Sequence, residues 1–139
     1  MMIDPDSSKG SGVATLSGLI LTLRQSETEQ ALKLVLVSYG YTLTCTDVER
    51  ERNLSFDVCV DILGDDVVRD DVLATAVDRH IVECDTAHPA AIEMRRSFFV
   101  GQSLLDEDIG TDEIKLRICA RDSSGGEISG MTGIVTGDF

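Results

Sequence analysis

The sequence predicts an all-β fold, an antiparallel β-sandwich of seven to eight strands. A length of 139 residues fits one domain. Apolar and polar residues alternate over several runs, which is the side-chain period of a β-strand. Both prolines, Pro5 and Pro89, fall outside these runs. We expect residues 1–12, rich in Ser and Gly, to form a flexible tail and residues 13–139 to form a single globular domain.

The strand candidates follow one another along the chain. Residues 13–23 contain alternating leucines, and residues 92–100 and 130–139 are rich in β-branched and aromatic side chains. Two further runs, residues 53–63 and 113–121, show the clearest alternation. Their apolar positions are Leu54, Phe56, Val58, Val60 and Ile62 in the first run, and Ile114, Leu116, Ile118 and Ala120 in the second. Ser124-Gly125-Gly126 is typical of a hairpin turn.

Two segments leave an α/β alternative open, with helices near residues 26–39 and 66–86. Ser26 and Glu29 form a capping-box pattern and Gly40 is a natural helix stop. Leucines at 32, 34 and 36 instead favour a long strand, paired with residues 54–63 through the charged turn 47–53. Apolar residues recur every fourth position between residues 66 and 88, which is helical spacing, whereas residues 79–85 also fit a strand.

The charge excludes several functions. Twenty-five acidic residues against twelve basic ones give a net charge of −13, which argues against nucleic-acid binding.

No apolar run reaches the roughly 20 residues of a membrane span. The first twelve residues lack the pattern of a signal peptide, so we expect a cytoplasmic protein. Sixteen Asp against nine Glu, and nine Arg against three Lys, favour a salt-adapted surface.

Part of the acid is clustered. Residues 66–72 and 108–114 share the order acid, three spacers, acid, acid, apolar. On the loops of a sandwich these carboxylates would offer the hard oxygen ligands that Ca²⁺ prefers. The predicted ligands are Asp65, Asp66, Asp70, Asp106, Asp108 and Asp112. The alternative interpretation is a solvated acidic surface that binds no cation.

The stretch from Asp106 to Asp112 resembles the third acidic loop of C2-type calcium-binding sandwiches, with an Asp-x-Asp followed by another Asp. Asp65 and Asp71 would stand in for the first loop of that family. The resemblance implies a β-sandwich that holds Ca²⁺ between loops at one tip.

The cysteines and histidines suggest little chemistry. His80, Cys84 and His88 would offer three zinc ligands on a helix but spread too far apart on a strand, and a packed Cys beside surface histidines is the alternative. Cys45, Cys59, Cys84 and Cys119 form no Cys-x-x-Cys motif, so we expect four reduced thiols. Cys59 and Cys119 fall on the Asp/Arg side of their strands, where a bridge becomes feasible if the strands are neighbours.

We therefore expect a non-enzymatic binding or assembly module whose partner is another protein or a second copy of the chain. The Gly-rich segment 130–139 would suit strand addition between copies. A calcium-binding module is one alternative. A degenerate receiver-like signalling domain is another, with Asp61 at the position that is phosphorylated. No nucleophile elbow or phosphate loop is present to indicate an enzyme.

Overall fold

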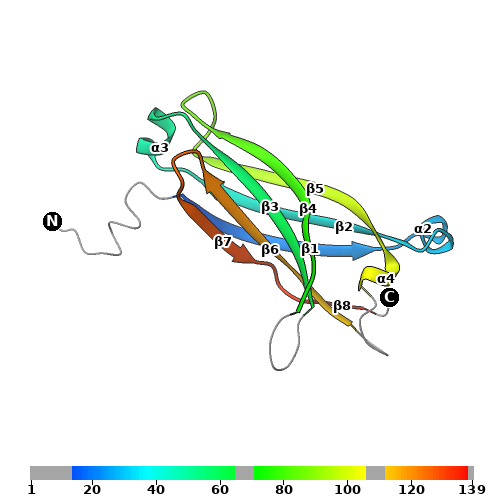
Figure 1. Cartoon of the computed structure of the whole chain (residues 1–139). Helices are drawn as coiled ribbons and strands as arrows, with labels where there is room; N and C mark the ends of the chain where they lie inside the picture. Colours follow the sequence, from blue (N-terminus) through cyan, green and yellow to red (C-terminus); the bar gives the residue numbers. More distant parts are fainter. Residues whose placement is uncertain (1–13, 65–70, 106–111, 138–139) are drawn as a thin grey trace.

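Two antiparallel sheets pack face to face in the computed structural model, which describes residues 14–64, 71–105 and 112–137 (Figure 1). Sheet A has the order β1 (Thr15–Arg24), β2 (Leu34–Thr44), β5 (Ala91–Gly101). Sheet B has the order β4 (Asp71–Cys84), β3 (Leu54–Gly64), β6 (Asp112–Asp122), β7 (Glu127–Met131), and β8 (Val135–Gly137) also pairs with β6. The predicted all-β sandwich is confirmed, and the α/β alternative is wrong.

Alternation along the central strands builds the core. All five predicted apolar positions of β3 and all four of β6 are buried. From sheet A, β2 contributes Val35, Val37, Tyr39, Tyr41 and Leu43 to the same layer. The intervening residues of each strand therefore face outward, which leaves two outer sheet faces available to partners.

Residues 26–39 do not form the helix of the alternative. Ser26 and Glu29 do make a capping box, but the helix that it starts, α2 (Glu27–Ala31), ends after one turn. Lys33 then adopts a φ of 59° and β2 begins. The Val and Tyr residues that follow gain more by alternating into the core than by continuing a helix with little to bury.

Residues 71–84 form a strand, so the helix predicted near residues 66–86 is also wrong. A spacing of four is even, and it therefore fits one face of a strand as well as one face of a helix. Ala76 has a φ of 52° within a stretch where the pairing register shifts. The backbone amide of Ala76 donates a hydrogen bond to Asp61 Oδ1 at 2.8 Å. Beyond this irregularity, Val82 and Cys84 are buried in the core.

The segment after β2 crosses between the sheets instead of forming a hairpin. The long strand that we offered as the alternative to a helix is present as β2, but its expected pairing with residues 54–63 through the charged turn 47–53 is wrong, because β2 pairs with β1 and β5. A second capping box, Thr46 with Glu49, starts the short helix α3 (Asp47–Glu51) at this crossing. The hairpin predicted at Ser124-Gly125-Gly126 is confirmed between β6 and β7, with Gly125 at a φ of 101°.

A disulfide joins the two sheets. Cys45, just after β2, is bonded to Cys84 at the end of β4, so the prediction of four reduced thiols is wrong for this pair. The sequence could not show that Cys45 and Cys84 meet, because they are 39 residues apart and lie at the ends of strands of different sheets. Cys59 and Cys119 are free. Among the described residues, no helix is long and apolar enough to cross a membrane.

Candidate functional site

The outer face of sheet A carries a shallow trough. Three cross-strand rows, each with one residue from β1, β2 and β5, lie side by side there. These rows are Ile20–Gly40–Arg95, Thr22–Ser38–Ser97 and Arg24–Leu36–Phe99. The middle row has only small hydroxyl side chains, and the rows beside it are taller. A hollow of about 350 Å³ results, lined mainly by the first two rows.

Small residues keep the floor of the trough open. Ser38 Oγ and Ser97 Oγ are 2.8 Å apart and share a hydrogen bond. At Gly40, a Cβ atom would lie 3.3 Å from Ile20 Cγ1 and 3.1 Å from the carbonyl oxygen of Met94. A bare glycine thus lets Ile20 lie across β2 and separate this hollow from a second one of about 210 Å³.

These three rows differ in charge from the chain as a whole, although Glu93 lies on the same face in the next row and lines the second hollow. Two arginines and no acidic residue occur among the nine positions, in a protein of net charge −13. Two large apolar side chains are also open to solvent, Ile20 at 45% and Phe99 at 55% exposure. A basic, partly apolar trough on an acidic protein is suited to an acidic ligand with apolar side chains.

A polar network closes the side of the sandwich where β4 and β5 are the edge strands. Asp78 of β4 accepts hydrogen bonds from Arg96 Nε at 2.8 Å, from Arg96 Nη2 at 3.2 Å and from the hydroxyl of Tyr39. Burial alone would raise the pKa of Asp78, but the hydrogen bonds from Arg96 and Tyr39 outweigh it and hold the pKa below its usual range. Burial, reinforced by Asp78, raises the pKa of Tyr39.

His80 continues this network one row further along β4. Its Nε2 shares a hydrogen bond with the hydroxyl of Tyr41, and the two rings stack with centroids 5.8 Å apart. Burial, followed by the positive charge of Arg96, lowers the pKa of His80, so the ring is neutral at pH 7. Its Nδ1 is buried without a hydrogen-bond partner in the described structure. The network links β4 of sheet B to β2 and β5 of sheet A, and two of its members, Tyr39 and Arg96, also line the hollow of about 350 Å³.

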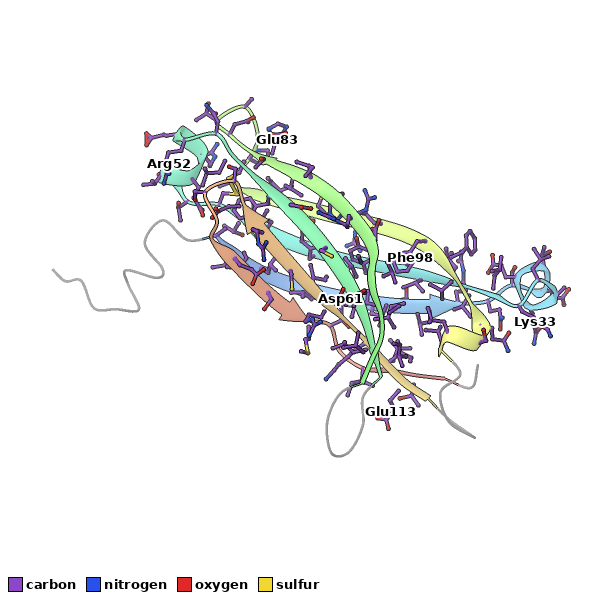
Figure 2. All side chains as sticks on the ribbon, in the orientation of Figure 1. Lys33, Arg52, Asp61, Glu83, Phe98 and Glu113 are labelled. Carbon is purple, nitrogen blue, oxygen red and sulfur yellow. A yellow bond between two sulfur atoms is a disulfide. The ribbon has the colours of Figure 1, made fainter. Side chains whose placement is uncertain are left out.

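The outer face of sheet B carries two thiols among ion pairs. Cys59 of β3 lies directly opposite Cys119 of β6. Ion pairs surround them: Asp57 with Arg79, Asp61 with Arg117 at 2.8 Å, and Glu127 with Arg121 at 2.9 Å. The cysteines and most of these charged residues line a hollow of about 300 Å³. Figure 2 shows Asp61 midway along this face.

The predicted calcium ligands lie outside what the structure describes. Asp65, Asp66, Asp70, Asp106 and Asp108 fall in undescribed segments, and for Asp112 only the backbone, at the start of β6, is described. The calcium site therefore stays a prediction. Within residues 14–64, 71–105 and 112–137, no group of three or more His, Cys, Asp or Glu side chains is placed to hold a metal.

The zinc hypothesis fails on geometry. His80 is bonded to Tyr41, Cys84 is in the disulfide, and His88 Nδ1 is 2.7 Å from Asp85 Oδ1. The receiver-like interpretation fails on fold, since Asp61 belongs to an antiparallel strand and is paired with Arg117. The segment 130–139 that we proposed for strand addition contributes to β7 and β8, which both pair with β6. Because β7 is the last strand in the order of sheet B, strand addition along its other side stays a prediction, and Phe139 lies outside the described residues.

Sequence reasoning did not identify the trough. Its signal was present in the outward positions of three strands, where Ser38, Gly40 and Ser97 interrupt strongly β-forming runs. Recognising it required knowing that β1, β2 and β5 are neighbours, and a single sequence does not supply that order.

Comparisons with known proteins add a distant likeness in shape. No family model and no curated protein matches the chain. A crystal structure assigned to the ApaA protein of Bordetella pertussis aligns with a TM-score of 0.39 at 8% identity, covering 88% of this chain and 90% of that one. The structural-genomics target SoR45 aligns with a TM-score of 0.42 at 8% identity, covering 88% and 84%. At this level of similarity neither structure contributes to a functional argument.

Proposed function

We propose that this protein is a non-enzymatic β-sandwich binding module that takes an acidic segment of a protein partner on the outer face of sheet A. The observation that carries the proposal is the trough itself, which combines two arginines with exposed Ile20 and Phe99 on a chain of net charge −13. A basic patch on an acidic protein concentrates attraction for anionic groups at one place, because the rest of the surface repels them.

The residue types of the trough suit recognition of a peptide. Arg24 and Arg95 lie on opposite walls, and their guanidinium groups can each take a carboxylate in a two-pronged hydrogen bond. Ser38, Ser97 and Thr22 along the floor offer hydroxyls that pair with peptide N–H and C=O groups. Ile20 and Phe99 would bury apolar side chains of the partner.

The proposal is tested with labelled peptides in which Glu alternates with Val or Leu, compared with otherwise identical peptides that carry Lys. We expect the Glu peptides to bind, and Arg95→Glu to weaken binding by about tenfold or more, equivalent to about 1.4 kcal/mol. Arg52→Glu is the matched control. Figure 2 shows Arg52 beside α3 at one end of the molecule, and it is exposed.

Equal binding of Glu and Lys peptides, or an unaltered affinity in Arg95→Glu, would contradict the proposal. Size exclusion with light scattering tests whether a second copy of the chain binds this face instead. A dimer that Arg95→Glu dissociates and Arg52→Glu does not would identify a second copy of the chain as the partner and replace the proposal.

A further inference from the structure

Cys59 and Cys119 are held as a pair by the register of sheet B. Both thiols point to the outer face from the two central strands, each is partly exposed, and each is free. The hollow of about 300 Å³ above them gives a small ion access. The pair is therefore fixed by backbone hydrogen bonding on both strands, which pre-organises two sulfur ligands.

The cross-strand position places the two sulfurs where one ion can bridge them. Cβ atoms of directly opposed residues on antiparallel strands are about 4.5–5.5 Å apart, and closer where the pair is not hydrogen-bonded. At the wider spacing, two sulfurs can lie on either side of a metal ion, each bonded to it.

We propose that Cys59 and Cys119 form a two-thiolate site for a soft monovalent cation with a filled d shell, of which Cu(I) is the type. Thiolates are the ligands that select Cu(I). Such ions accept two ligands in a linear arrangement, and sheet B places two thiols opposite each other. Zinc and calcium need four or more ligands.

Binding at this site exchanges protons for the ion without any redox change. The two S–H bonds break, two metal–sulfur bonds form, and two protons pass to solvent. The two thiolates carry two negative charges and the ion carries one positive charge, so the complex has a net charge of −1. Arg79 lies beside Cys59 and Arg117 beside Cys119, and their positive charges counter the repulsion of that charge by Asp61 and Glu127.

The neighbouring carboxylates do not compete for a soft ion. They are hard ligands, and arginines already hold them in ion pairs.

The test is an anaerobic titration of the full chain with Cu(I), with ascorbate as reductant so that the Cys45–Cys84 disulfide stays intact, in competition with a chromophoric chelator. We expect one Cu(I) per chain. Cys59→Ser and Cys119→Ser should each weaken binding by more than about 100-fold, because losing even an outer-shell partner of a metal ligand costs about 10–100-fold. Ser129→Ala, opposite Cys119 on β7, is the control that keeps wild-type binding.

Alkylation of the wild-type protein gives a second readout that needs no variant. Iodoacetamide should modify Cys59 and Cys119 without Cu(I) and neither of them after loading. The proposal is overturned if the two serine variants bind Cu(I) as tightly as the wild type, or if the wild type takes no Cu(I) from the chelator. It is also overturned if iodoacetamide still modifies both thiols of the Cu(I)-loaded protein.

Discussion

At the scale of single residues, Asp78 and His80 determine how the two sheets meet along one side. Asp78 joins β4 to both β2 and β5 through Tyr39 and Arg96, and His80 adds a second link to Tyr41. The sequence offered a strand only over residues 79–85, as an alternative to a helix. It could not show that Asp78 and His80 face the other sheet, because the irregularity at Ala76 sets the phase of the strand.

Asp78→Asn should destabilise the fold by about 1.5–3 kcal/mol, in the range for hydrogen bonds to charged groups. The carboxylate is 14% exposed and Arg96 is 36% exposed, so solvent compensates only in part for the lost charge. Asp57→Asn, which removes an ion pair open to solvent, is the control and should leave urea unfolding nearly unchanged. Equal losses in the two variants would show that the network contributes no more than a surface ion pair.

His80 should make stability depend on pH in the weakly acidic range. Its pKa is lower in the folded protein than the ordinary 6.5. The unfolded chain therefore binds the proton more readily, and stability is full above the ordinary value and falls as pH drops toward the folded pKa. In His80→Gln the melting temperature should fall less than in the wild type over the pH unit or so below 6.5. Parallel pH profiles would contradict this assignment.

At the scale of elements, the two capping boxes have different roles although they share one sequence pattern. Ser26 and Glu29 cap an exposed turn of helix beside β2. In the other box, Glu49 is 2% exposed and also accepts a hydrogen bond from the amide of Ala14 at 2.9 Å. The pattern indicated a helix start in the first case. In the second case, the charged residues 47–53 favoured a hairpin turn. The sequence could not reveal the role of Glu49, because its burial depends on Ala14, which is 35 residues away.

Glu49→Ala should cost about 1–3 kcal/mol, because it leaves the amide of Ala14 and the cap of α3 without their acceptor inside the protein. Glu29→Ala is the matched control and should cost less, about 0.5–1 kcal/mol, since water replaces the lost cap. Urea unfolding measures both. A loss from Glu29→Ala as large as that from Glu49→Ala would show that capping, and not the tether to Ala14, is what Glu49 contributes.

At the scale of the whole molecule, side-chain period alone determined the fold class, but the order of the strands required long-range information. The residues facing inward on β3 and β6 could be read directly from alternation. The pairing of β2 with β5, which builds the trough, and of Cys45 with Cys84 joins segments about 40 or more residues apart, and neither leaves a local trace in the sequence.

The Cys45–Cys84 disulfide should contribute strongly to stability. It links the ends of β2 and β4 across the two sheets and closes a loop with a sequence separation of 39. Replacing both residues by Ala should lower the free energy of unfolding by about 2–4 kcal/mol, by freeing the unfolded chain. Replacing Cys59 and Cys119 by Ser in the metal-free protein should change it much less. A reversal of that order would contradict the role assigned to the disulfide.

The net charge of −13 predicts opposite effects of salt on stability and on binding. Sodium chloride screens the repulsion among carboxylates, so the melting temperature should rise between about 0.05 and 1 M salt. The same screening weakens the attraction of Arg24 and Arg95 for an acidic peptide, so its affinity should fall over that range. Chloride is the appropriate salt, because sulfate stabilises proteins by exclusion from their surface. An affinity that does not fall with salt would show that the arginines of the trough do not provide the attraction. A melting temperature that does not rise would show that the carboxylates are already neutralised by their partners.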